Sequence, residues 1–300
     1  MSVFALVCTG VSAIAHEIAS QPEAWAEAAR LAPRLAGVLP EPGERIAVVG
    51  CGTSAFMAQA YASLRESTGH GETDAFPASE MPSGRKYHAI LAISRSGTTT
   101  EVLRLLKAAD VRSVAITAVA SSPIARAADD SVELEFADER SVVQTRFATT
   151  TLALLRAHMG QDLARAIADA ELAVRADLPM KPQDYDHFVF LGTGWTVGLA
   201  HEAALKMREA SGSFTESYPA MEYRHGPISL AGRRSVVWSL GQVDDRLLED
   251  VAATGARVVT GRLDPMAGLI EVQRTAAALA ELRGLDPDHP RHLTRSVVLS

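Results

Sequence analysis

Residues 48–66, VVGCGTSAFMAQAYASLRE, and residues 190–209, FLGTGWTVGLAHEAALKMRE, follow the same pattern. Each starts at the end of an apolar run, passes through Gly-x-Gly and continues with the spacing of a helix. When the glycines are aligned, with a one-residue gap further on, Arg65-Glu66 matches Arg208-Glu209. A repeat of this kind predicts that one α/β unit has been duplicated within the chain.

Short apolar runs alternate with helical stretches along the first half of the sequence. An opening amphipathic helix is predicted over 20–39, with Ser20 as its N-cap and Pro22 near its start. Strands are then predicted at 45–49, 88–93, 113–117 and 132–136, and helices at 55–65, 99–108 and 145–170. This alternation is typical of βαβ units and predicts a parallel sheet.

The stretch ADLPMKPQDYDHFVF, residues 176–190, holds two prolines and a polar patch between the predicted long helix and a new strand at 188–191. Prolines and polar clusters of this kind mark loops. The sequence therefore predicts a first domain over 1–180 and a second over 181–300.

The chain has 300 residues, 47% of them hydrophobic and 22% charged, with a net charge of −7. This composition is typical of a soluble globular protein of about two domains. The basic residues are scattered, which argues against nucleic acid or an anionic membrane as a partner. No run reaches the ~18 apolar residues that a membrane-spanning helix needs.

Two cysteines, Cys8 and Cys51, cannot build a disulfide framework, and no Cys/His cluster has the spacing of a structural zinc site. A reducing cytoplasm fits this pattern. The start, MSVFALVCTGVSAIAH, carries no Lys or Arg before its apolar stretch, so we expect an ordinary helix or strand there in preference to a signal peptide.

Two loops, GCGTS (50–54) and SRSGTT (94–99), combine glycine with small hydroxyl side chains between a predicted strand and a predicted helix. In an open parallel sheet such turns lie at the edge where ligands bind, and N–H groups at a helix start attract anions. Serines and threonines also cap helices, but two such loops in successive units favour a phosphate site. Its predicted donors are Gly52, Thr53, Ser54, Ser94, Ser96 and Thr99.

Neither loop matches the motif of a common nucleotide. No Gly-Lys-Ser/Thr follows, and Gly50-x-Gly52 lacks the third glycine of the dinucleotide fingerprint, so ATP and NAD are disfavoured. The corresponding step of the second half, VWSLGQVDDRLLEDV, has acidic residues in place of the hydroxyls, so we expect no anion there. Arg95 either contacts the phosphate or points to solvent, and the sequence leaves both open.

Glu202, Lys206 and Glu209 recur at i, i+4 and i+7 on one predicted helix face. Such charges commonly form a solvated salt-bridge stripe, but the repeat places this helix against a sheet. His225 stands before Gly226-Pro227 in a predicted loop, where it either caps the turn or takes part in chemistry near pH 7.

These motifs together resemble those of double SIS (sugar isomerase) domain proteins, and the chain is similar to the isomerase half of glucosamine-6-phosphate synthase and to amino-sugar phosphate isomerase/deaminases. The motifs that carry the resemblance run from residue 17 to the C-terminus: GCGTS, ASEM, AISRSGTTTE, SSPIARAAD, EAALKMRE, ESYPAMEYRHGP and DPDHPRHLTRSV. The resemblance implies an α/β fold of two tandem SIS domains, each a parallel sheet flanked by helices in a flavodoxin-like three-layer sandwich.

The resemblance also implies roles for single residues. It assigns Glu209 to proton transfer between C1 and C2 of the sugar, and His225 to ring opening in the site of the partner subunit, so a homodimer is expected. It assigns contacts with the sugar phosphate to a wider set: Gly52, Thr53, Ser54, Ser94, Arg95, Ser96, Thr99, Val142, Lys206 and Arg295.

Two departures from the synthase pattern bear on mechanism. The synthase tail has a Schiff-base lysine where this chain has Arg295, and arginine cannot serve as that amine nucleophile. SVVQTRF (141–147) follows the family's segment loosely, which leaves the contacts of Val142 to Thr145 open. The chain also has no glutaminase half before these motifs, so we do not expect the full amidotransferase.

The resemblance implies a phosphosugar isomerase, expected to convert a hexosamine 6-phosphate into a ketose 6-phosphate with release of ammonia, without a metal or redox cofactor. A fructosamine 6-phosphate deglycase is the nearest alternative enzyme. A sugar-phosphate-binding regulator is the alternative from another class, but the first 40 residues hold no basic recognition helix.

Overall fold

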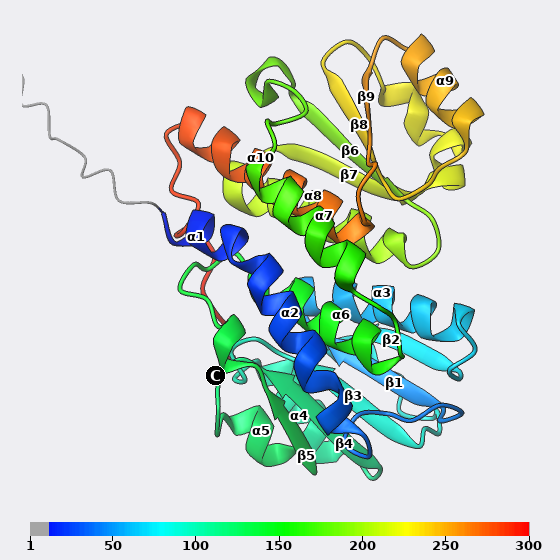
Figure 1. Cartoon of the computed structure of the whole chain (residues 1–300), viewed down its shortest axis with the longest axis vertical. Helices are drawn as coiled ribbons and strands as arrows, with labels where there is room; N and C mark the ends of the chain where they lie inside the picture. The colour runs from blue at the N-terminus through cyan, green and yellow to red at the C-terminus, as the bar shows by residue number, and fades with distance from the viewer. Residues whose placement is uncertain (1–11, 300) are drawn as a thin grey trace, which may run out of the picture.

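The first half of the chain forms a five-stranded parallel sheet. A computed structural model describes residues 12–299, and Figure 1 shows its arrangement. The sheet order is β2-β1-β3-β4-β5. The strands are β1 (Ile46–Gly50), β2 (Thr73–Pro77), β3 (Ala89–Ile93), β4 (Arg112–Thr117) and β5 (Asp130–Glu133). All four pairings are parallel, so the carboxyl ends of β1 and β3 lie side by side at one edge.

The second half repeats this topology in a four-stranded parallel sheet of order β7-β6-β8-β9. Its strands are β6 (His187–Gly192), β7 (Phe214–Pro219), β8 (Ser235–Leu240) and β9 (Arg257–Thr260). In both sheets the strand before Gly-x-Gly lies second from the edge and pairs with the next two strands in the sequence. The predicted α/β architecture with parallel sheets is confirmed.

Helices fill the space between the sheets and cover their outer faces (Figure 1). The helices are α1 (Ala13–Ala19), α2 (Gln21–Leu31), α3 (Thr53–Ser67), α4 (Thr100–Ala108), α5 (Pro123–Ala127), α6 (Arg146–His158), α7 (Ala164–Arg175), α8 (Thr196–Ser211), α9 (Asp245–Ala253) and α10 (Pro265–Leu282). Six short 3₁₀ helices complete the described part: Ala32–Leu35, Ala78–Glu80, Glu135–Ala137, Pro182–Asp184, Ala220–His225 and Pro227–Leu230.

One hydrophobic core joins the two halves. It contains Val48 and Leu91 of the first sheet together with Phe190 and Trp238 of the second, packed around α3, α6, α8 and α10. The strand side chains that alternate with these point to the outer faces of the sheets. There they pack against α4 and α5 on the first sheet and against α9 on the second. Both faces of each sheet are therefore buried, which explains the continuous apolar runs that predicted the strands.

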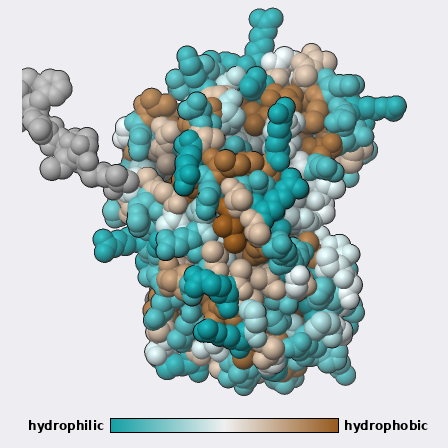
Figure 2. All heavy atoms as spheres, in the orientation of Figure 1, coloured by the Kyte–Doolittle hydropathy of each residue, from teal (hydrophilic) through white to brown (hydrophobic). Residues whose placement is uncertain are grey.

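An apolar band crosses the middle of the face shown in Figure 2, amid charged and polar side chains. Shallow hollows on this side are lined by α1, α2, α7 and α10, with Ile167 and Val174 among their residues. The same helices pack against the shared core, so the band is the outer rim of the layer between the two sheets.

Several predictions of local structure were wrong. The predicted helix 145–170 is two helices, α6 and α7, because Gly160 takes a left-handed conformation (φ 80°) after α6 ends. The predicted strand 132–136 is shifted to β5 and followed by a 3₁₀ turn. Ser20 precedes α2 but its hydroxyl donates to the Glu17 carbonyl and caps no N–H group. Strands β2, β7 and β9 were not predicted at all.

The residues 1–11, including Cys8, lie outside the described part, so the expectation of a helix or strand there is not tested. Among the described residues, no helix is long and apolar enough to cross a membrane, and no group of three or more His, Cys, Asp or Glu side chains is placed to hold a metal ion. The domain boundary near residue 180 stays a prediction.

Helices α3 and α8 cross closely, and this crossing builds the site. A Cβ atom on Gly198 of α8 would lie 2.5 Å from the carbonyl oxygen of Phe56 and 2.7 Å from the nitrogen of Ala60, both on α3. Only glycine permits backbones to approach this closely. The approach brings the Lys206 face of α8 to the start of α3, and therefore to the first hydroxyl loop.

Candidate active site

The two hydroxyl loops lie next to each other at the carboxyl edge of the first sheet. GCGTS joins β1 to α3, SRSGTT joins β3 to α4, and β1 pairs with β3. Within the second loop, the hydroxyls of Ser94 and Thr99 lie 3.2 Å apart. Thr53, Ser54, Ser94 and Ser96 are buried. The structure thus brings the predicted phosphate donors of both loops together, as their places in the sequence predicted.

The hydroxyls of these loops do not cap the helices that follow. Gly52 and Thr99 are the N-cap residues of α3 and α4, and neither helix has a side-chain cap. Within residues 12–299, no hydrogen bond from the main-chain N–H groups of Arg95, Ser96 and Thr99 is found. N–H groups at a helix start that lack partners are suited to an anion.

The corresponding turns of the second half are filled by their own side chains. The Thr193 N–H donates to the Thr196 hydroxyl at 2.8 Å, in the turn that matches GCGTS. The Asp244 carboxylate accepts from the Leu247 N–H at 3.0 Å and caps α9. Asp244 thus caps α9 with its side chain, whereas α4 of the first half has no side-chain cap.

Gly97 gives the second loop its shape. Its φ is 64°, and a Cβ atom there would lie 2.1 Å from the Ser122 hydroxyl oxygen. The Ser122 hydroxyl accepts from the Ala125 N–H and caps α5, so it cannot move away freely. Both the turn and the tight contact require glycine at this position.

The C-terminal tail lies on the second loop. The Ser96 and Thr98 hydroxyls donate to the Ser296 hydroxyl at 3.0 and 2.9 Å, and the Thr100 N–H donates to the Val297 carbonyl at 3.3 Å. The end of the chain therefore returns from the second half to the first sheet (Figure 1). Sequence reasoning missed Thr98 and Ser296; their hydroxyls gave no signal beyond the motif around them.

The structure excludes one of the two alternatives that the sequence left open for Arg95. It is 1% exposed, so it does not point to solvent. Its guanidinium donates to the carbonyls of Ser141, Val142 and Arg295 at 2.9, 3.2 and 3.0 Å. A bidentate phosphate contact through this side chain would compete with these bonds. The predicted contact with substrate is not tested by the structure and stays a prediction.

A buried charge cluster on α8 adjoins the first loop. Glu202 and Lys206 are 0% and 1% exposed, so this face is not the solvated stripe that such spacing commonly forms. The Lys206 Nζ donates to the Thr53 hydroxyl at 2.9 Å, forms an ion pair with Glu209 and lies 3.4 Å from a Glu202 oxygen. Glu209 keeps a side-chain exposure of 19% and is the partly open member of the cluster.

The environment perturbs two of these charges. Burial raises the pKa of Glu202 to about 8, although the ammonium of Lys206 opposes the shift. Burial alone would lower the pKa of Lys206, but the carboxylates of Glu202 and Glu209 outweigh it and raise that pKa. Near neutral pH Glu202 therefore favours its neutral, protonated form, while Lys206 is charged and pairs with Glu209.

Val142 and Arg295 lie beside the second loop, where their carbonyls accept from Arg95. The Val142 N–H donates to the Asp288 carbonyl at 2.9 Å, and its carbonyl accepts from Arg95. The Arg295 guanidinium is bonded to the Glu139 carbonyl and to the carboxylate of Asp138. In this arrangement Arg295 holds the tail to the 138–139 segment.

His225 is not brought together with the other predicted residues. It is exposed and ends the 3₁₀ helix Ala220–His225 of the second half. Among the described residues its ring makes no hydrogen bond or ion pair, and nothing joins it to Glu209 or to the loops. If it serves this site, the site must be completed from another copy of the chain.

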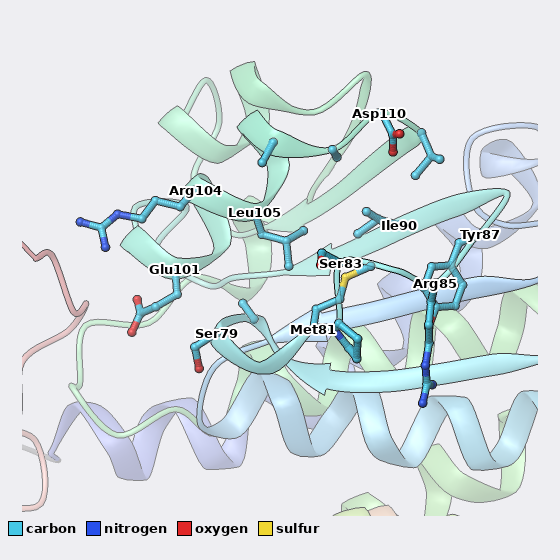
Figure 3. A pocket seen from close by; sticks show the side chains of 15 residues that line it. Ser79, Met81, Ser83, Arg85, Tyr87, Ile90, Glu101, Arg104, Leu105 and Asp110 are labelled. Carbon is cyan, nitrogen blue, oxygen red and sulfur yellow. The ribbon is translucent and has the colours of Figure 1, made fainter.

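A groove of about 510 Å³ lies elsewhere, on the outer face of the first sheet (Figure 3). It is bounded by α4 and the 78–87 segment, with Met81, Ile90 and Leu105 on its floor and Arg85 and Arg104 at its rim. It contains none of the predicted site residues, so the size of this hollow does not locate the chemistry.

Comparison with known proteins agrees with this geometry. The model of the SIS domain matches residues 41–159. The glutamine–fructose-6-phosphate aminotransferase of Sulfolobus acidocaldarius is 31% identical over 85% of this chain and 50% of its own length, and that of Sulfurisphaera tokodaii is 29% identical over the same shares. The chain thus spans about half the length of the curated relatives it matches.

Solved structures give the same result. A glucosamine-6-phosphate deaminase from Thermotoga maritima superposes with a TM-score of 0.83 at 26% identity, over 96% of this chain and 100% of that one. A tagatose-6-phosphate ketose/aldose isomerase from Escherichia coli has a TM-score of 0.78 at 20% identity, over 99% and 98% of the two chains, a likeness of fold. Residues 41–159 are a SIS domain, and the chain is homologous to the isomerase domain of the glutamine–fructose-6-phosphate aminotransferases.

Proposed function

We propose that this protein is a phosphosugar isomerase that acts on a hexosamine 6-phosphate. One observation carries the proposal: Lys206 Nζ joins the Thr53 hydroxyl of the first loop to the Glu209 carboxylate. A phosphate held by the loops thereby places the sugar carbons next to a positioned carboxylate. Homology to the isomerase domain of the aminotransferases supports the same chemistry.

The proposed reaction divides the work among these groups. The phosphate lies against the hydroxyls and N–H groups of residues 53–54 and 94–99. His225 of a second copy assists ring opening. Glu209 takes the proton from C2 of the open-chain sugar and returns it to C1, which gives an imine at C2, and addition of water there releases ammonia and leaves the ketose phosphate. Lys206 pairs with the Glu209 carboxylate and positions it for the first step.

We also propose two tandem SIS units, over 1–180 and 181–300, as the source of this arrangement. The duplication is supported by the order of the first four strands of the first sheet, which matches that of the four strands of the second. The first unit supplies the phosphate loops, and the second supplies α8 with Glu209. Arg295 replaces a Schiff-base lysine with a permanently charged group, so the proposed route forms no such adduct.

A panel of substrates tests the proposal. We expect the protein to exchange the C1/C2 proton of glucosamine 6-phosphate and to release ammonia, both followed by NMR and an ammonia assay. N-acetylhexosamine and fructosamine 6-phosphates serve as comparison substrates. Exchange without ammonia would mean an isomerase only, turnover of the fructosamine alone would mean a deglycase, and binding without any product would restore the regulator.

A homodimer with shared sites is part of the proposal, and variant mixing tests it. We expect Glu209→Gln and His225→Asn homodimers each to be nearly inactive. If His225 acts in the partner's site, a heterodimer has one intact site, so an equal mixture after subunit exchange regains about a quarter of the wild-type activity. Activity that stays at the level of the separate variants would contradict shared sites.

A further inference from the structure

Arg95 lies where three segments far apart in the sequence meet. Its guanidinium donates to the carbonyls of Ser141 and Val142, which lie between β5 and α6. It also donates to the carbonyl of Arg295 in the C-terminal tail. Arg95 itself belongs to the SRSGTT loop. One side chain thus fastens the phosphate loop to two neighbours through main-chain atoms.

The surroundings of Arg95 favour a role in holding neighbouring segments together over direct contact with a ligand. Among the described residues, Glu139 is the only carboxylate within 4.0 Å of the Arg95 guanidinium, with one oxygen 3.8 Å away. That carboxylate is itself buried and accepts from the N–H groups of Thr145 and Arg146 at the start of α6. Burial lowers the pKa of Arg95, yet an arginine stays charged, so its three bonds to carbonyls compensate the lost hydration.

The bond to Arg295 fixes the tail in register on the loop. The next residue of the tail, Ser296, meets the next residue of the loop, Ser96, at 3.0 Å. One residue further, the Val297 carbonyl accepts from the Thr100 N–H. Arg95 is the only charged group of the SRSGTT loop, and a side chain with one or two donors could not reach all three carbonyls.

We propose that Arg95 is a positioning residue, which holds tail residues 295–297 and the 141–142 segment on the phosphate loop and so sets the affinity of the site for a phosphorylated ligand without touching it. The identity of that ligand rests on the proposed function. The attachment of the tail does not, because it can be measured without any ligand.

The test compares Arg95→Gln with the matched variant Arg104→Gln, which removes an exposed arginine from α4. Trypsin cleavage after Arg295, followed by mass spectrometry, reports release of the tail. We expect Arg95→Gln to accelerate this cleavage and to raise the Kd for glucosamine 6-phosphate in calorimetry, each by about tenfold or more, since bonds to charged groups of this kind are lost. Arg104→Gln should behave as wild type in both measurements.

Further variants keep the test decisive if Arg95→Gln folds poorly. Arg95→Gln/Glu139→Gln removes both buried charges together. Arg95→Lys should have a cleavage rate and a Kd between those of wild type and Arg95→Gln, because one ammonium can replace some of the hydrogen bonds of the guanidinium. In a chain shortened after Thr294, adding Arg95→Gln should raise the Kd less than it does in the full chain, because the two changes act through one contact.

Wild-type cleavage rates in Arg95→Gln, or additive effects of the substitution and the shortening, would overturn the proposal. If the wild-type protein binds no sugar phosphate, the proposed function fails, and the cleavage rates alone still decide the role of Arg95.

Discussion

Glu209→Gln is expected to lower kcat for glucosamine 6-phosphate by about 10²- to 10⁴-fold, the usual contribution of a positioned acid/base group. Glutamine keeps the size of the side chain and an oxygen that can accept from Lys206. It cannot take a proton from C2. The substitution should therefore leave KM nearly unchanged, because in the proposed site the loops of the first half, and not Glu209, hold the phosphate.

Steady-state kinetics with ammonia as the readout check this result, together with C1/C2 proton exchange by NMR. Glu249→Gln on α9 is the control, since that glutamate is exposed and far from the loops in the fold. Undiminished exchange in Glu209→Gln would remove Glu209 from the mechanism. A rise in KM with unchanged kcat would instead make Glu209 a binding group.

The sequence predicted the parts of the fold that follow from local patterns. The five residues of β1 and the five of β3 are all buried, and they form apolar runs in the sequence because both faces of the sheet are covered. The Gly-x-Gly repeat predicted two equivalent units, and the structure has two parallel sheets in which four strands follow the same order, with a fifth strand in the first sheet. Edge strands β2 and β7 were missed, since one side of each is half exposed and the apolar signal fades.

The site was predictable in its loops and unpredictable in its long-range contacts. Adjacent strands carry GCGTS and SRSGTT to one edge by topology alone. No pattern, in contrast, reveals that Arg95 meets the carbonyl of Arg295, 200 positions away in the sequence. Every residue carries a main-chain carbonyl, so the sequence does not indicate which carbonyl a given side chain will bind.

The Lys206 cluster lies between these two cases. The i, i+4, i+7 spacing placed Glu202, Lys206 and Glu209 on one face, and the repeat suggested burial. The contact between the Lys206 Nζ and Thr53 depends on the close crossing of α3 and α8 at Gly198. This crossing is a feature of tertiary packing that the sequence does not show. Alanine and other helix formers surround Gly198 in the sequence, so nothing local distinguished it as a contact point.

The free energy of unfolding of the wild-type protein is expected to decrease between about pH 4.5 and pH 8, and Glu202→Gln is expected to abolish this decrease. The pKa of Glu202 rises from 4.5 to about 8 in the folded chain, chiefly through burial. The folded state therefore binds more protons than the unfolded state throughout this window, and the free energy of unfolding decreases as the pH rises through it. Glutamine has no proton to release, so its contribution stays constant.

At pH 5 the two proteins should have similar stability, because wild-type Glu202 is neutral there and resembles glutamine in shape. At pH 8 the variant should be more stable relative to wild type, by on the order of a few kcal/mol, the free energy that corresponds to the shift in pKa. Lys206 stays charged across the window, since its pKa is raised, and the Glu209 carboxylate continues to pair with it. Urea unfolding at several pH values measures the difference, and Glu249→Gln should follow wild type throughout.

Parallel stability curves for Glu202→Gln and wild type would mean that Glu202 ionises in the folded protein near its ordinary pKa. The cluster would then carry a net negative charge at neutral pH, a charge that would repel the phosphate this site is proposed to hold.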